Sequence, residues 1–383
     1  MTAACACAGA RSTDPPAAPG SIAPRLASFG ERIVLSWVER DAAGGAALRF
    51  VTRQKDAWGE PKTVKRDARL AADTADVPSV VPLPNGALAA HWTVKRDGSA
   101  HARDLVVATS ADGGASWGEP VSPHHDDTAS EHGMATIVPG ETPNTFGICW
   151  LDGRSGEQSD YGEGGTSLYW ADWSGGGFGP EVLLDPRVCD CCKTSAARGP
   201  LGPVVAFRDR SEAERRDISF VRRDGTSWSE PQQVHVDGWS LTACPTNGPS
   251  IAILGDRATL AWFTAAAATP SAWIARSVDA GKTFGAPVRI DGGAPVGRVE
   301  ATILADGSTA VVWLERQGKE AQVRVRRVAP DGALSPSVAV GTTSPARASG
   351  YPTIAAGGSK DVLVVWTETG SPGRLRASVV PLP

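Results

Sequence analysis

The chain has 383 residues, a formal net charge of -4 and a hydrophobic content of 41%, values typical of a soluble globular protein. This weak charge gives no electrostatic basis for binding nucleic acid or an anionic membrane, and no apolar run is long enough to predict a transmembrane span. At this length we expect two domains or one repeat architecture, and the 43 glycines, 29 prolines and 13 tryptophans favour an all-β protein rich in turns.

The first nine residues lack the basic and apolar regions of a complete signal peptide. Small residues precede Cys5 and Cys7, and this pattern is typical of the cleavage end of a lipoprotein signal whose upstream part is missing; the alternative is a disordered cytoplasmic start. Residues 12–20 are rich in proline and alanine, which is typical of a tether. We therefore assign residues 1–20 to a signal remnant and tether and residues 21–383 to one folded domain, and we predict a periplasmic or lipid-anchored location.

An apolar segment that ends in tryptophan or phenylalanine recurs along the chain at intervals of 51 to 58 residues. The seven aromatic residues that end these segments are Trp37, Trp92, Trp150, Phe207, Trp262, Trp313 and Trp366. A short apolar stretch precedes each segment and another follows it. Four short antiparallel strands repeated at this period predict a β-propeller of seven blades, with six as the alternative count.

The seventh unit ends after its third strand, near Val379. A propeller ring closes when a segment from the other end of the chain completes its last blade. We predict that the N-terminal segment near residues 21–23 supplies this missing strand.

Two turns, at residues 110–117 and 277–284, share the pattern S-x-D-x-G-x-x-[WF]. In each turn the aspartate can accept hydrogen bonds from backbone amides, the glycine permits the bend and the aromatic ring packs beneath it. The residues in these roles are Asp112, Gly114 and Trp117 in the first turn, and Asp279, Gly281 and Phe284 in the second. The pattern resembles the Asp box of the sialidase (neuraminidase) superfamily, and this resemblance implies a propeller in which the boxes are structural and lie opposite the active face.

The catalytic pattern of that superfamily fits this chain poorly. The resemblance implies three substrate-binding arginines, a tyrosine nucleophile paired with a glutamate, and an acidic aspartate. The early strand Ala23–Leu26 lacks the Arg-Ile-Pro motif of the family, and the chain has 3 tyrosines. We therefore expect a member without sialidase activity and keep an exo-glycosidase as an alternative, with Tyr351, Glu300 and Arg208 as its candidate residues.

In a propeller all innermost strands begin at one face, so the residues just before them converge at the mouth of the central channel. This geometry brings together a cysteine-rich run and residues from the neighbouring units. The predicted metal ligands are Cys189, Cys191, Cys192, Cys244, His132 and Met134, with His124 and His125 as secondary candidates.

Thiolates combined with imidazole or thioether groups favour Cu(I) or zinc. We predict a copper site used in envelope metal handling or a metal-dependent redox step, with zinc or no metal as alternatives. A disulfide from this cluster to Cys244 remains open, as does a redox thiol. If disulfides dominate, the chain is a stapled scaffold that binds a protein or a glycan. We expect a monomer whose partner is a metal-trafficking protein or a glycan, and no nucleic acid.

Overall fold

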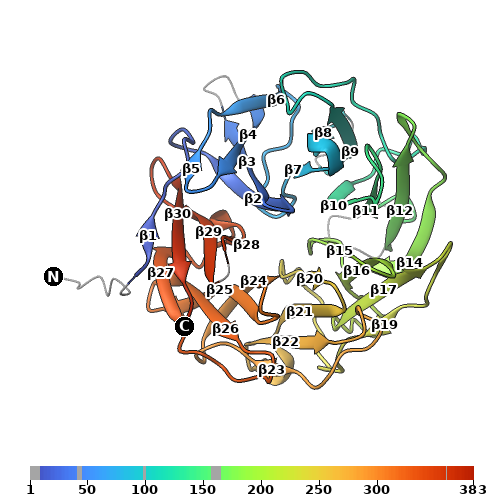
Figure 1. The fold of residues 1–383 in the computed structure, drawn as a ribbon. Coiled ribbons are helices and arrows are strands. Elements are labelled where there is room, and N and C mark those ends of the chain that lie inside the picture. The colour runs from blue at the N-terminus through green and yellow to red at the C-terminus, as the bar shows by residue number, and fades with distance from the viewer. Residues whose placement is uncertain (1–8, 41–44, 98–100, 157–164, 359) are drawn as a thin grey trace.

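The computed structural model describes residues 9–40, 45–97, 101–156, 165–358 and 360–383, and these form seven antiparallel sheets arranged in a ring (Figure 1). The prediction of an all-β, seven-bladed propeller is therefore confirmed. The helical segments in this part of the chain are short 3-10 turns, and none of its helices has the length and apolar character needed to cross a bilayer.

Each blade places its strands in chain order from the channel outward. The innermost strands are β2 (Ile22–Phe29), β7 (Ser79–Pro82), β10 (His132–Pro139), β15 (Ser195–Gly199), β20 (Ser250–Leu254), β24 (Pro295–Ile303) and β28 (Thr353–Ala356). The second strands are β3 (Arg32–Arg40), β8 (Leu88–Lys95), β11 (Phe146–Asp152), β16 (Gly202–Arg208), β21 (Arg257–Thr264), β25 (Thr309–Gln317) and β29 (Asp361–Glu368). The third strands are β4 (Ala46–Gln54), β9 (Arg103–Ser110), β12 (Thr166–Ser174), β17 (Ile218–Asp224), β22 (Ser271–Ser277), β26 (Glu320–Val328) and β30 (Arg374–Pro381).

The outer positions are filled by shorter strands. These are β5 (Ala57–Trp58), β6 (Lys62–Asp67), β13 (Gly177–Phe178), β14 (Val182–Val188), β18 (Ser227–Trp228), β19 (Gln232–Gln233), β23 (Val288–Arg289), β27 (Val338–Thr343) and, in the seventh blade, β1 (Arg11–Ser12). In the second blade β9 has isolated bridges, Val107 with Val121 and Arg103 with Glu131, in place of an outer strand.

The repeated aromatic residues lie buried in the second strands and form the core between blades. Burying an indole requires a partner for its N–H group. In three blades the tryptophan Nε1–H donates a hydrogen bond to the carboxylate of the residue two positions further along the chain. The pairs are Trp37–Glu39, Trp150–Asp152 and Trp313–Glu315.

The two Asp boxes form the turns that follow β9 and β22. In the first, the Asp112 carboxylate accepts hydrogen bonds from the Ser116 amide at 2.9 Å and from the Ser110 hydroxyl at 2.8 Å. Gly114 has φ +81°, and a Cβ there would lie 2.3 Å from the Phe50 ring, so the turn requires glycine. The second box repeats these contacts around Asp279. Because a third strand ends at the face opposite the one where it begins, both boxes lie opposite the cysteine-rich face.

The N-terminal segment closes the ring, but not through the residues that the sequence indicated. Arg11 pairs with Val379 and Ser12 with Ser378, so β1 completes the seventh blade beside β30 (Figure 1). The prediction of residues 21–23 as this strand is wrong, because Ile22 begins the innermost strand of the first blade and pairs with Val38. Residues 11–12 thus belong to the propeller, whereas the predicted signal remnant at residues 1–8 lies outside the described residues.

We expect removal of residues 1–20 to lower the melting temperature by about 5 °C or more, because β1 and the Thr13 contacts to Trp58 and Arg53 would be lost. Differential scanning calorimetry measures this change. Removal of residues 1–8 is the matched control and keeps β1. Equal melting temperatures for the two truncated proteins would show that β1 does not hold the ring closed.

Candidate functional site

The cysteine-rich run lies in a turn between blades three and four, after β14 and before β15. The backbone fixes it at both ends: the Cys189 amide donates to the Arg208 carbonyl at 2.9 Å, and the Thr194 amide donates to the Met134 carbonyl at 3.3 Å. Cys189 and Cys192 are each only 1% exposed. The turn therefore holds two thiols inside the protein.

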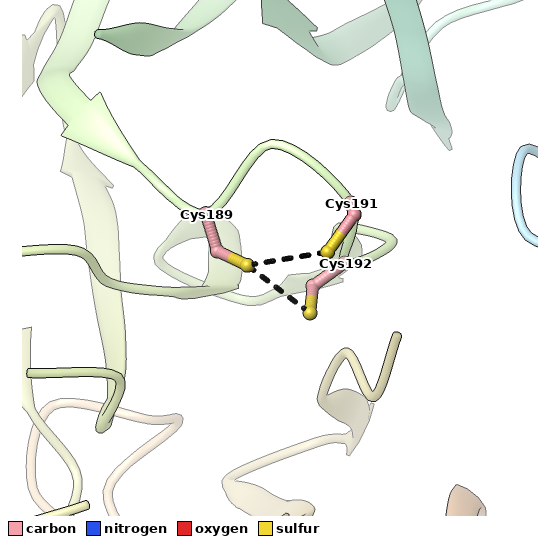
Figure 2. A group of neighbouring side chains, drawn as sticks. All are labelled: Cys189, Cys191 and Cys192. Atoms are coloured by element: carbon pink, nitrogen blue, oxygen red, sulfur yellow. Dashed lines mark hydrogen bonds between the residues drawn. The ribbon is translucent and has the colours of Figure 1, made fainter. Parts of the chain in front are cut away.

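The sulfur atoms of this turn lie close together but differ in bonding (Figure 2). Cys191 forms a disulfide with Cys244, which precedes blade five, with a Cα–Cα distance of 6.0 Å. Cys189 and Cys192 are free thiols whose Sγ atoms lie 3.3 Å apart, and the Cys189 Sγ lies 3.8 Å from the Cys191 Sγ. The cluster thus combines a dithiol with an adjacent disulfide that links two blades.

Two neighbouring cysteines point in different directions because the run forms a turn and not an extended strand. Cys191 reaches the partly exposed Cys244 loop, whereas Cys192 faces the interior and accepts a hydrogen bond from the Asn247 amide at 3.4 Å. The remaining pair, Cys189 and Cys192, has C-x-x-C spacing, which the intervening Cys191 conceals in the sequence.

The two free thiols differ in acidity. Burial alone would raise the pKa of Cys192, but the hydrogen bond from Cys189, the Arg208 charge and the Asn247 amide together lower this pKa to about 7. Donating that hydrogen bond to Cys192, together with burial, raises the pKa of Cys189 well above its ordinary value. Near neutral pH the Cys192 thiolate is therefore substantially populated, whereas Cys189 keeps its proton. The third free thiol, Cys149, is buried apart from the cluster, and burial raises its pKa to about 11.

Arg208 is the positive group behind this cluster. Its guanidinium donates to the Asn247 carbonyl at 2.8 and 2.7 Å and to the Phe263 carbonyl at 2.7 Å, and it lies 4.8 Å above the Trp239 ring. These bonds hold the Cys244–Asn247 loop against blades four and five. The sequence indicated Arg208 as a candidate glycosidase residue. Its side chain is only 1% exposed and its guanidinium donates to backbone carbonyls, so it faces no open substrate site.

The structure does not bring the predicted third-blade ligands to the sulfur atoms. His132 Nδ1 contacts the Arg103 carbonyl and Nε2 the Asp126 carboxylate, so both ring nitrogens engage other groups. His132 is the first residue of β10, the innermost strand of blade three, and it lies on the side of this blade that faces blade two. The cysteine turn lies on the other side of blade three, next to blade four. Met134 packs in the apolar core between blades three and four, and His125 is exposed beside Glu181.

Of the candidate glycosidase residues, Glu300 lines the central channel, where the innermost strands enclose a cavity of about 580 Å³. Glu300 accepts hydrogen bonds from Arg25 at 2.7 Å and from Lys193 at 3.3 Å. Lys193 in turn lies 4.7 Å from the Tyr351 ring. The cysteine turn and the channel network are therefore adjacent through Lys193, the residue that follows Cys192.

Comparison with solved structures places this fold among known propellers. A protein of unknown function from Dyadobacter fermentans aligns over 98% of this chain and 100% of its own, with a TM-score of 0.55 and 17% identity. The leech intramolecular trans-sialidase aligns over 91% and 82% at 10% identity (TM-score 0.52), and the α-L-arabinanase of Penicillium chrysogenum over 97% and 98% at 12% identity (TM-score 0.52). The fold is that of the sialidase-like propellers. No family model matches the chain, and no curated protein does.

The environment of Tyr351 is not that of an activated tyrosine. The Tyr351 hydroxyl donates to the Thr246 carbonyl at 2.9 Å and accepts from the Gly248 amide at 3.2 Å. Burial raises the pKa of Tyr351, which disfavours the phenolate that a nucleophile requires. Tyr351 thus holds the loop before blade five, next to the cysteine cluster.

We expect Glu300→Gln to lower the free energy of unfolding by about 3 kcal/mol at pH 7, because the buried Lys193 and the partly buried Arg25 would lose their shared carboxylate. Burial opposes ionisation of Glu300, but these two cations hold its pKa below the ordinary value. The contribution is therefore present above about pH 4.5 and is lost at lower pH, where wild type and variant should converge.

Urea denaturation at several pH values measures this difference. Glu368→Gln, which breaks the exposed pair with Arg374, is the matched control and should change stability by less than about 0.5 kcal/mol. A Glu300→Gln effect no larger than that of the control would contradict the assigned role of the network.

Proposed function

We propose that this propeller binds a soft metal ion, Cu(I), through the thiolates of Cys189 and Cys192. The supporting observation is the sulfur cluster itself: two free thiols lie 3.3 Å apart, a third sulfur lies 3.8 Å from one of them, and one thiol has a pKa near 7. Thiolate sulfur is a preferred ligand of Cu(I).

Burial favours a metal ion over a protein substrate at these thiols. Each cysteine is 1% exposed, so a partner protein's disulfide has no access to either sulfur without movement of the turn. A metal ion is small enough to be enclosed there. Two thiolates with one Cu(I) carry a net charge of -1, which the Arg208 guanidinium and the Asn247 N–H group face. The buried complex is therefore compensated in charge.

Copper suits this ligand set better than zinc. Zinc in structural sites takes four ligands, commonly cysteine and histidine, whereas Cu(I) accepts two or three sulfur ligands. The described residues place three sulfurs within 4.8 Å of one another, and no imidazole belongs to that group.

The disulfide also supports an extracytoplasmic location, because reducing compartments keep thiols reduced. Envelope copper handling is the corresponding role. A stapled scaffold for a protein or glycan is the second candidate function, favoured by the same disulfide across blades four and five. The two differ in one respect: a scaffold has no need to bind Cu(I).

We expect the protein to bind about one equivalent of Cu(I) under anaerobic conditions, measured by competition with a colorimetric Cu(I) chelator. Cys189→Ser and Cys192→Ser should each weaken binding by about 100-fold or more, because each removes a thiolate ligand. Cys149→Ser is the matched control, since this buried free thiol lies outside the cluster, and its affinity should be unchanged. Equal affinities for all three variants would exclude the site.

The pH dependence of the Cu(I) affinity should reflect the different pKa values of the Cys189 and Cys192 thiols. Above pH 7 binding displaces mainly the Cys189 proton, and the affinity should rise roughly tenfold per pH unit. Well below pH 7 the Cys192 proton also competes, and the slope should approach roughly 100-fold per unit. The chelator competition repeated from pH 5.5 to about 8.5 measures both slopes. An affinity independent of pH would contradict thiolate ligation.

A further inference from the structure

The central channel carries more positive than negative charge at the end next to the cysteine turn. Arg25 in β2, Lys193 just before β15 and Glu300 in β24 line the channel cavity of about 580 Å³, and their strands lie around the centre of the ring (Figure 1). Glu300 is the only carboxylate among the described residues that line this cavity. We infer that this end of the channel is a binding site for a small monovalent anion of the halide class, Cl⁻.

Glu300 does not neutralise both of its cations. Arg25 Nη1 lies 2.7 Å and Lys193 Nζ 3.3 Å from the same oxygen, Glu300 Oε2. The other oxygen, Oε1, accepts a hydrogen bond from the Thr353 hydroxyl at 2.7 Å. One carboxylate therefore faces two cations, and one positive charge remains, which is costly inside a protein unless an anion pairs with it. His91 lines the same cavity, but burial, followed by the Arg25 charge, lowers the pKa of His91 to about 3, so its ring adds no charge at neutral pH.

Both cations also keep unused hydrogen-bond donors. A guanidinium and an ammonium each have several N–H groups and no acceptor. Toward the described residues, the Arg25 side chain makes one hydrogen bond, to Glu300. The Lys193 ammonium likewise makes one, to Glu300, and lies 4.7 Å from the Tyr351 ring. Because both side chains line the cavity, their remaining N–H groups are available to an ion inside it.

Spacing and charge together select a small monovalent ion. Because Arg25 Nη1 and Lys193 Nζ contact one carboxylate oxygen, they are close enough for a single ion to contact both side chains. A monatomic anion accepts N–H groups from any direction, so it needs no second arginine to orient it. One negative charge balances the remaining positive charge, whereas a dianion such as sulfate would place a further negative charge beside Glu300.

The other end of the channel has an arginine with a carboxylate of its own. Arg198 lies near the end of β15 and also lines the cavity. Its Nε donates to the Pro139 carbonyl at 2.8 Å, and its Nη1 lies 3.5 Å from the Glu141 carboxylate. Arg198 is therefore a matched control, because it is a cation of the same cavity that lies outside the proposed site.

Melting temperatures of the full chain in different sodium salts test this site in solution. At constant ionic strength, replacing the bulky anion gluconate by up to about 200 mM chloride should raise the melting temperature by about 1 °C or more, along a saturating curve. Lys193→Met and Arg25→Met should each remove this rise, whereas Arg198→Met should keep it. Each variant is compared with itself in the two salts, so a lower stability of the variant does not affect the readout. Sulfate should produce no rise that Lys193→Met removes.

Bromide provides a second readout that uses the unmodified chain. Crystals grown in sodium bromide should show an anomalous-scattering peak in contact with the Arg25 guanidinium and Lys193 Nζ. Absence of this peak, or equal melting temperatures in chloride and gluconate, would overturn the proposal. A chloride effect that Lys193→Met and Arg25→Met leave intact, or that Arg198→Met also removes, would overturn it as well. A sulfate effect that depends on Lys193 would contradict the assignment of a monovalent ion.

Discussion

In a propeller the hydrogen-bonded ladders run within blades, so neighbouring blades are joined mainly by side chains. Among the described residues each ladder of paired strands belongs to one blade, and an isolated bridge such as Val188–Asp209 adds a backbone link between neighbouring blades. β1 is the strand that joins the beginning of the described chain to its last blade. The contacts between blades therefore decide the shape of the ring. Apolar packing supplies many of them, and polar contacts add to it at both faces, including the face where the innermost strands begin.

The polar groups at the face where the innermost strands begin form three sets of contacts. Each set shares either the Cys244–Asn247 loop or the cysteine turn with another. Arg208 fixes the Cys244–Asn247 loop, the Cys191–Cys244 disulfide joins the same loop to the cysteine turn, and Lys193 connects that turn to Glu300 in the channel. Each network places groups from distant parts of the sequence in one low-exposure location. Such buried polar groups are costly unless all are satisfied. The thiol pair is the place where the proposed Cu(I) ion would complete the set.

Much of the fold could be predicted from the sequence because its signals are local and repeated. The aromatic residue of each second strand packs in the core in every blade, and the glycine has the same role in both Asp boxes. The convergence of the residues before the innermost strands also followed from topology. The error at the ring closure arose because residues 11–12 are too short a strand to carry a pattern, whereas residues 22–29 have a clear one.

The candidate site was predicted only in part, since its details depend on side-chain direction. Topology brings Cys189, Cys192 and Cys244 together, but it does not decide that Cys191 takes the disulfide and leaves a C-x-x-C dithiol. It also placed His132 at the channel mouth without showing that its ring turns toward blade two.

The central claim is that Cys191 and Cys244 form a disulfide, so that Cys189 and Cys192 remain as a pair of adjacent free thiols. Peptide mapping by mass spectrometry, after alkylation of the denatured protein without reductant, tests it most directly. The structure predicts alkylated Cys149, Cys189 and Cys192 and a cross-linked pair of peptides that contain Cys191 and Cys244. A disulfide between Cys189 and Cys192, or from either of them to Cys244, would contradict the account.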